Sequence, residues 1–364
     1  MDTALYDMAV IGAGPAGSVC AYSALATSEQ VSVALIDRDN FPRDKACGDA
    51  VRNDAVSVLS ELNLGAIFND RTEVRDLRAT YPPKYRYLQK LFEWNENTYY
   101  IIERKVFDHY LYEAAINRGA RDFTGYRLIN AKFDELGKFW NLILRQKSGA
   151  ITEMRCRTLV GADGAGSRVR RTAGLERNED DHTSLALRAY AKADGLTEGI
   201  MRIDYLENLI PGYGWTFPLL DGKVNIGVVI NKRDFKRNES RLETYLDEYV
   251  RYLQSEGVTI KNLDDVKTHP LPLGSQSPPL VPKHRVALIG DAAAMIDPFS
   301  GEGIHYGIWA GHTLGSAIGN CMNGGGNIQS AMEYYAKAYT EQFGKDMEAS
   351  ESVRVWVRFH KLFM

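Results

Sequence analysis

Three glycines near the N-terminus have the spacing of a turn that binds phosphate. They are Gly12, Gly14 and Gly17, in the run GAGPAG. In such a turn the first glycine lets the chain reverse tightly, the second leaves room for a pyrophosphate, and the third lets helix and strand pack closely. The start of the following helix presents unpaired amides and a partial positive charge. The motif therefore predicts that this turn, with Pro15 and Ala16, holds the phosphates of a dinucleotide.

A carboxylate follows at the distance expected for an adenosine ribose. Asp37 comes 20 residues after Gly17, at the end of an apolar run over 31–36, and Arg38 is next to it. An aspartate at this position can accept hydrogen bonds from both ribose hydroxyls. An apolar strand before the glycines (8–11) and a helix of small residues after them (16–26) complete a strand, turn and helix. This order favours a dinucleotide over the alternative, an α/β turn without a ligand.

Two later segments repeat this strand-to-turn pattern. Asp163 lies inside a glycine-rich turn after the apolar residues 158–161. Its carboxylate could bond ribose hydroxyls or cap the helix that follows. Gly290 and Asp291 end a second apolar run, over 286–289, and Asp291 could hold a ribityl hydroxyl. Both aspartates are therefore candidate cofactor ligands.

A third glycine-rich segment opens a long helix that we expect over residues 304–320. It runs from Gly301 through Glu302 and Gly303 into Ile304. Backbone amides at such a helix start could bond the pyrimidine edge of a flavin and favour its anionic reduced ring. Arg104 precedes another helix, predicted over 106–117, and could reach a phosphate. The alternative is an exposed arginine at a helix start that binds no ligand, and this alternative stays open.

Two further features could form the reactive part of a site. The polar loop after Asp37 should run back over a bound dinucleotide, which makes Cys47 and Gly48 a candidate active-site turn. The alternative is a surface loop with an incidental cysteine. In the strand that precedes the hairpin turn Asp221-Gly222, the side chains of Tyr213, Trp215 and Phe217 alternate onto one face. Three aromatic residues there form either core or the wall of an apolar pocket, and glycines at 212 and 214 favour the wall.

Composition narrows the class of protein. A net charge of −3 over 364 residues gives no reason to expect nucleic-acid binding. No apolar run approaches the roughly 20 residues of a membrane span, and the first strand begins too early for a signal peptide, so we expect a cytoplasmic protein. The four cysteines are scattered, which disfavours zinc or disulfides. Residues 326–364 should be helical, and the aromatic and basic residues 353–361 could touch a membrane surface, although a packed helix is the favoured interpretation.

Taken together, the three strand-to-turn elements resemble the FAD-dependent hydroxylase superfamily typified by p-hydroxybenzoate hydroxylase. The resemblance implies an α/β, Rossmann-like, discontinuous FAD-binding domain with an antiparallel-sheet substrate domain. It implies that Asp37 binds the adenosine ribose, Arg104 and Asp291 the middle of FAD, and residues from Pro298 to Gly303 the flavin ring. The expected FAD domain comprises residues 1–75, 101–182 and 270–325, and the substrate domain 76–100 and 183–269. Within these we expect an antiparallel excursion over 74–81 and 85–94, a meander over 126–157, a helix over 242–255 and a proline-rich connection over 269–282.

Two stretches resemble the geranylgeranyl reductase family within that superfamily. Lys45-Ala46-Cys47-Gly48 matches its K-x-C-G turn, and the strand from Tyr213 to Pro218 matches its Y-x-W-x-F-P pattern. The family saturates isoprenoid double bonds with reduced FAD, with the cysteine turn near the flavin and the aromatic strand lining the lipid pocket. The sequence departs from the pattern at Leu219, where the family has a basic residue, and at Gly227-Val228-Val229, which stands where the family has G-x-G.

The resemblance leads to a mechanism with named candidates. Cys47 is the first candidate to donate or position a proton, and Tyr213 and His305 are the next candidates. Electrons would come from NAD(P)H or a ferredoxin. Alternatives on the same fold are a monooxygenase or epoxidase and a halogenase, although the halogenase strand reads W-x-W-x-I-P and differs here at Tyr213 and Phe217. A further alternative is a noncatalytic prenyl-binding protein that resembles the Rab escort proteins. The acceptor and the oligomeric state, monomer or dimer, stay open.

Overall fold

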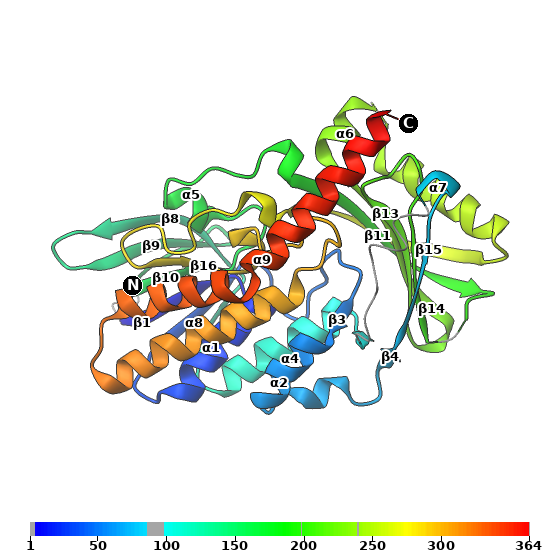
Figure 1. Ribbon diagram of the computed structural model, residues 1–364. Helices are drawn as coiled ribbons and strands as arrows, with labels where there is room; N and C mark the ends of the chain where they lie inside the picture. Colours follow the sequence, from blue (N-terminus) through cyan, green and yellow to red (C-terminus); the bar gives the residue numbers. More distant parts are fainter. Residues whose placement is uncertain (1–3, 86–97, 198, 239, 364) are drawn as a thin grey trace.

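The computed structural model describes residues 4–85, 98–197, 199–238 and 240–363. Two large sheets lie side by side, with helices covering one face of the first sheet and a long C-terminal helix crossing from the first sheet to the second (Figure 1). The first sheet has the strand order β7-β2-β1-β10-β9-β8, and β16 pairs with β10. These strands are β1 (Leu5–Ile11), β2 (Val33–Asp37), β7 (Arg121–Thr124), β8 (Tyr126–Asp134), β9 (Phe139–Gln146), β10 (Ile151–Gly161) and β16 (Val286–Leu288).

The parallel centre of this sheet explains why its strands are apolar throughout. β1 pairs in parallel with β2 and β10, and β10 pairs in parallel with β16. Parallel strands are usually buried on both faces, and in β2 all five side chains are buried. The carboxyl ends of β1, β10 and β16 carry the three turns at residues 12, 161 and 290. The fold therefore brings turns from distant parts of the chain to one edge of one sheet.

Helices α1 (Pro15–Thr27) and α8 (Ile304–Gly324) pack against each other through glycines. A methyl group on Gly311 would lie 2.3 Å from the carbonyl oxygen of Ala16, and one on Gly315 would lie 2.3 Å from that of Cys20. The two backbones therefore touch only because these positions lack a side chain. This contact fixes the start of α8 beside the first glycine turn.

We expect Gly311→Ala to destabilise the protein because its methyl group would push these two helices apart. Overpacking of this kind costs about 1–3 kcal/mol. Gly324→Ala on the same helix is the matched control, since nothing lies within 4 Å of its added methyl group. Denaturant unfolding measures both variants, and equal stabilities would contradict the expectation.

The second sheet has the order β15-β11-β14-β13-β12-β5. Helix α7 (Leu242–Ser255) packs its apolar residues against one face of this sheet. The opposite face carries Tyr213, Trp215 and Phe217 toward the first sheet. The strands are β5 (Asp76–Thr80), β11 (Thr183–Asp194), β12 (Ile200–Asp204), β13 (Tyr213–Pro218), β14 (Lys223–Asn231) and β15 (Thr259–Pro272).

Smaller elements complete the fold. A three-stranded sheet has the order β3-β6-β4. Its strands are β3 (Ala50–Arg52), β6 (Tyr99–Ile101) and β4 (Thr72–Val74). Among the described residues the other α-helices are α2 (Asn53–Glu61), α4 (Arg104–Asn117), α5 (Arg168–Thr172), α6 (Lys232–Arg237) and α9 (Ile328–Phe363). None of the helices in the described ranges is long and apolar enough to cross a membrane.

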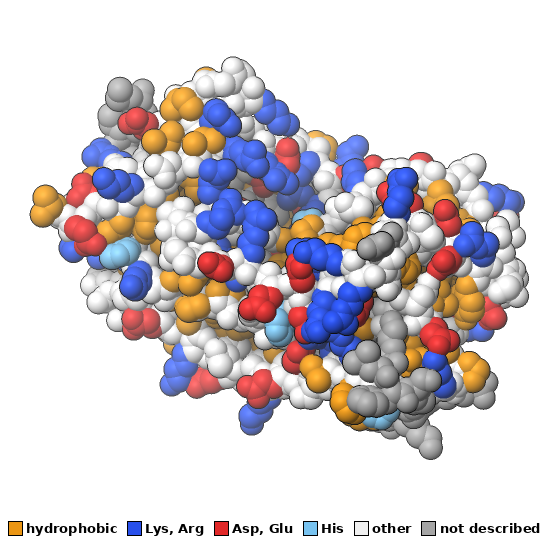
Figure 2. Space-filling view, turned by 90° about the horizontal axis from the view of Figure 1, so that it is seen from above, with side chains coloured by type: hydrophobic (Ala, Val, Ile, Leu, Met, Phe, Trp, Pro, Cys, Tyr) orange, Lys and Arg blue, Asp and Glu red, His pale blue; other side chains and the backbone are white. Residues whose placement is uncertain are grey.

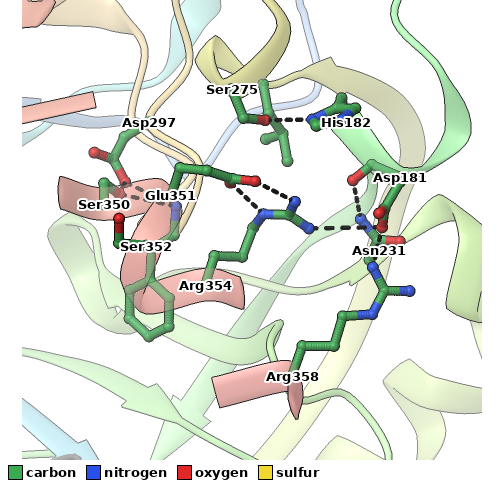
Figure 3. A network of polar contacts seen from close by, with 12 residues as sticks. Asp181, His182, Asn231, Ser275, Asp297, Ser350, Glu351, Ser352, Arg354 and Arg358 are labelled. Carbon is green, nitrogen blue, oxygen red and sulfur yellow. Dashed lines mark hydrogen bonds and ion pairs between the residues drawn. The ribbon is translucent and has the colours of Figure 1, made fainter. Parts of the chain in front are cut away.

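Helix α9 connects both halves of the molecule. It packs against α8, and Figure 3 shows its Ser350 directed to Asp297 and its Arg354 and Arg358 directed to Asp181. Arg358 also donates to Asp234 at 2.8 Å. Arg354 and Val357 are buried, which agrees with a packed terminal helix, whereas Val355 and Phe359 are exposed. Membrane contact stays a prediction.

The α/β fold class, the 126–157 meander and the 242–255 helix are confirmed. Two expectations have different outcomes. The antiparallel excursion over 74–81 and 85–94 stays a prediction, because residues 86–94 lie outside the described residues, and the described strand β5 pairs in parallel with β12. The second expectation was wrong. The connection over 269–282 begins as strand, because β15 stays paired with β11 up to Pro272. The domain boundaries stay a prediction.

Candidate active site

A cavity of about 690 Å³ lies between the two large sheets. On the face of the molecule in Figure 2, Lys and Arg side chains gather over the centre. Of the residues predicted to be catalytic or to bind the cofactor, only Gly17 and Pro298 are absent from the wall of this cavity. The wall includes Gly12, Gly14, Pro15, Ala16, Asp37, Arg38, Cys47, Gly48, Arg104, Asp163, Tyr213, Trp215, Phe217, Gly290, Asp291, Gly301, Glu302, Gly303, Ile304 and His305.

The three glycines of the first turn are needed for different structural reasons. Gly12 has φ +106, and a methyl group there would lie 2.1 Å from the carbonyl oxygen of Ala162. Gly17 packs against the carbonyl oxygen of Gly12, which explains why it does not reach the cavity. Gly14 has extended backbone angles, and a methyl group there would meet only Arg43, at 3.4 Å. The turn is thus open at Gly14, which fits a pyrophosphate.

Asp37 and an arginine that the sequence did not reveal lie beside this turn. The Asp37 carboxylate accepts hydrogen bonds from the amides of Ala13 and Asp39, at 2.8 and 2.9 Å. Arg43 Nη2 lies 4.0 Å from Asp37, and its Nη1 donates to Asp108 at 2.8 Å. Arg43 therefore holds a cation over the open glycine. No local pattern marks it, because Asp108 comes from a helix 65 residues later.

Arg104 is buried, which corrects the alternative of an exposed arginine at a helix start. It is 4% exposed, and its guanidinium donates twice to Asp108, at 2.5 and 2.7 Å. The Arg104 guanidinium also lies close to the Cys47 side chain. Arg104 thus joins the wall of the cavity at the cysteine turn.

Asp163 caps the short helix that follows it. Its Oδ2 accepts from the amides of Arg168 and Val169 at 2.6 and 3.2 Å, and its Oδ1 accepts from Ser167. Of the two roles that the sequence left open, the structure shows the helix cap. The carboxylate still borders the cavity.

Asp291 has two cationic or ionisable neighbours. Lys45 Nζ donates to its Oδ2 at 2.8 Å, and His269 Nε2 lies 3.4 Å from the same oxygen. Burial alone would raise the pKa of this carboxyl, but Lys45 and His269 hold it below its usual range. The acid is therefore ionised and fixed in the cavity wall. His269 was not found from sequence, because it extends from the part of β15 that the pattern assigned to a connection.

The loop from Asp297 to Gly303 is held from three sides. Asp297 Oδ1 accepts from the amides of Phe299 and Ser300, at 2.9 and 2.7 Å. From α9, Ser350 Oγ donates to the same oxygen at 2.6 Å (Figure 3). The Tyr213 hydroxyl donates to the Ser300 carbonyl from the second sheet.

Only part of the predicted amide set is open to a ligand. The amide of Gly301 donates to the Asp297 carbonyl at 3.1 Å, and that of Glu302 donates to Ser300 Oγ at 3.3 Å. The amides of Gly303 and Ile304 are at the start of α8, where the helix offers no acceptor. These two amides are therefore the ones placed to bind an anionic ring edge.

Glu302 and His305 form a polar cluster at the same end of the cavity. The Tyr99 hydroxyl donates to Glu302 Oε1 at 2.9 Å, and Arg52 donates to Oε2 at 3.3 Å. Burial raises the pKa of Glu302 despite Arg52. His305 Nδ1 lies 3.8 Å from Glu302, and burial lowers the pKa of this histidine well below its usual value. His305 is therefore neutral near pH 7.

The cysteine turn packs against the aromatic residues. A methyl group on Gly48 would lie 2.9 Å from the Phe217 ring. Tyr213, Trp215 and Phe217 are each less than 10% exposed and belong to one apolar cluster, yet all three line the cavity. The core and wall interpretations are therefore both correct for this strand.

Asp49, next to this turn, gives a testable pH dependence. It is fully buried, and burial raises its pKa to about 7, although hydrogen bonds from Tyr190 and Asn225 and the charges of Arg188 and Arg104 oppose the shift. Because the folded-state pKa of Asp49 is raised, the stability that its neutral carboxyl contributes is fully present below about pH 4 and is lost as the pH rises through 7. We expect this loss, about 1.4 kcal/mol per pH unit at most, to be absent in Asp49→Asn.

Denaturant unfolding of both proteins at several pH values between 4 and 8 measures this effect. Parallel stability curves for the wild type and Asp49→Asn would show that the carboxyl does not titrate in this range.

The glycine turns, Asp37, Asp291 and the apolar wall share one cavity, which fits a protein that binds a dinucleotide next to an apolar substrate. A family model described as FAD binding domain matches residues 6–346. Menaquinone reductase of Mycobacterium tuberculosis is 31% identical over 84% of this chain and 74% of its own length. The chain therefore belongs to the FAD binding domain family, among the FAD-dependent oxidoreductases that include the geranylgeranyl reductases.

Two further comparisons agree with this family. Digeranylgeranylglycerophospholipid reductase of Methanosarcina acetivorans is 28% identical over 96% of this chain and 84% of its own length. The crystal structure of a geranylgeranyl bacteriochlorophyll reductase-like protein from Thermoplasma acidophilum matches with a TM-score of 0.80 at 21% identity, over 97% of this chain and 87% of that one. The structural likeness supports the fold.

Proposed function

We propose that this protein reduces carbon–carbon double bonds of an isoprenoid chain with electrons from FAD. The observation that carries the proposal is the continuity of the cavity, whose wall includes the open glycine turn at Gly14, the Cys47 turn and the aromatic wall at Trp215. A dinucleotide at the glycines and an apolar chain on the aromatic rings would meet at Cys47. The names of the relatives support the acceptor class, since digeranylgeranyl lipids and menaquinone both carry isoprenoid chains.

The residues of the cavity suit a reaction on an unactivated alkene. Reduced FAD supplies the hydride when bound. Trp215 and Phe217 exclude water and orient the chain, which is the main help that such a substrate can receive. The neutral His305 holds no extra proton, and the Tyr213 hydroxyl is already donated to Ser300. Cys47 is therefore the proposed proton donor, and NAD(P)H or a ferredoxin the proposed electron source.

Anaerobic turnover tests this function. The FAD-loaded enzyme is reduced with dithionite, a geranylgeranyl lipid or menaquinone is added, and flavin reoxidation is followed together with product mass. We expect reoxidation with a gain of two hydrogens. Turnover only in air, with an oxygen atom in the product, would instead identify a monooxygenase, and protein that takes up no FAD would favour a prenyl-binding protein.

A further inference from the structure

One buried amide connects the cysteine turn to the aromatic wall. Asn225 lies on β14 and is 0% exposed. Its Nδ2 donates to the carbonyl oxygen of Cys47 at 2.7 Å and to Asp49 Oδ2 at 2.8 Å. Its Oδ1 accepts from Trp215 Nε1 at 2.8 Å. Both amide hydrogens and the amide oxygen are therefore engaged with three residues of the cavity region.

The orientation of this amide follows from the chemistry of its partners. An indole N–H can only donate, so the amide oxygen must face Trp215. A backbone carbonyl can only accept, so the amide nitrogen must face Cys47. In a flipped amide, the NH₂ group would face the indole N–H and the amide oxygen would face the Cys47 carbonyl oxygen, so both hydrogen bonds would be lost. Asn225 can thus hold the turn and the indole in only one arrangement.

Asn225 lies on β14, which is hydrogen-bonded to a neighbouring strand on each side. Asn225 is paired with Tyr190 of β11 and with Phe217 of β13. The indole of Trp215 extends from Asn225 over Gly227, where a methyl group would lie 2.2 Å from the ring. The side chain therefore projects from a rigid position in the middle of the sheet.

The turn itself has further ties that converge on the same place. The Tyr190 hydroxyl donates to Asp49 Oδ2 at 2.7 Å, and the amide of Ile102 donates to the Asp49 carbonyl at 2.9 Å. Asp49 has a positive φ of 65, which a residue without a local restraint rarely adopts. Asn225 is the one of these partners that also holds the indole.

We infer that Asn225 is a positioning residue that sets the Cys47 thiol relative to the aromatic wall that holds the substrate. The inference rests on the proposed function, because the wall is where the isoprenoid chain would lie. A change at Asn225 should shift the Cys47 turn, but it should leave the residues that bind the cofactor and those that bind the isoprenoid chain in place. Its effect should therefore appear in the reaction step rather than in binding.

An exchange of side chains isolates the bond to Cys47. In the double variant Asn225→Asp with Asp49→Asn, the new amide nitrogen at 49 takes the place of Oδ2 and can donate one hydrogen to the carboxylate at 225 and the other to the Tyr190 hydroxyl, which now accepts. Trp215 keeps its acceptor at 225. The carboxylate at 225 can no longer donate to the Cys47 carbonyl. We expect the FAD content and melting temperature to stay near those of the wild type, whereas kcat for alkene reduction falls at least about tenfold with KM changed less than about twofold. Wild-type kcat in this variant would overturn the inference.

A second readout does not depend on the substrate. Alkylation of Cys47 by iodoacetamide in the FAD-loaded protein, followed by peptide mass spectrometry, reports the freedom of the turn. We expect the double variant to react at least about five times faster than the wild type, and equal rates would overturn the inference. If the wild type fails to reduce alkenes, the proposed function fails, but this measurement still decides the role of Asn225.

Discussion

Replacing Cys47 by alanine should lower the rate of alkene reduction by about 100-fold or more, while FAD stays bound. Loss of a positioned proton donor typically costs 100-fold to 10,000-fold. The turn should keep its shape, because Asn225 holds the backbone carbonyl of Cys47 rather than its thiol. Single-turnover reoxidation of the reduced enzyme by a geranylgeranyl lipid measures the effect.

Cys321→Ala is the matched control for this variant. Cys321 is also a free cysteine, but it belongs to α8 and is not part of the cavity wall. It should turn over at the wild-type rate. If Cys47→Ala did so as well, the cysteine would be a bystander, and the proton would have to come from another group.

Replacing Gly14 by valine should remove FAD and leave the fold intact. The backbone at Gly14 is extended, so a side chain causes no strain there, and its first carbon meets only the flexible end of Arg43. The side chain would instead occupy the space where a pyrophosphate must approach the amides. We expect the affinity for FAD to fall at least 100-fold, which is about 2.7 kcal/mol, and the apoprotein to melt within a few degrees of the wild type.

Gly12→Ala provides the contrast. Its methyl group would collide with the carbonyl oxygen of Ala162, and its φ is positive, so the fold itself should suffer. FAD titration and thermal melting separate the two outcomes. Tight FAD binding by Gly14→Val would show that the cofactor does not lie at this turn.

The sequence predicts those parts of the site that local chemistry determines. Glycine spacing, an apolar strand before it and an aspartate at a strand end are all local, and they identified Gly12, Asp37 and Asp291. Tyr213 and Trp215 were found for the same reason, since alternation along one strand places them on one face.

The residues that sequence reasoning missed depend on contacts between distant segments. Arg43 is oriented by Asp108, and His269 approaches Asp291 only because β15 is longer than its prolines suggested. Asn225 contacts a turn 178 residues earlier. The parallel pairing of β5 is equally nonlocal, and no periodicity within residues 74–81 reveals its direction.

Helix α9 has a consequence for how variants of this protein should be interpreted. Ser350 of α9 holds the Asp297 loop. Arg358 lies about two turns further along the same helix and forms ion pairs with Asp181 and Asp234 in the other half of the molecule. Replacing Asp181 or Asp234 would shift helix α9 and weaken the hydrogen bond by which Ser350 holds the Asp297 loop. A random mutational survey should therefore recover pale, flavin-poor clones altered at Asp181 or Asp234, although neither side chain borders the cavity.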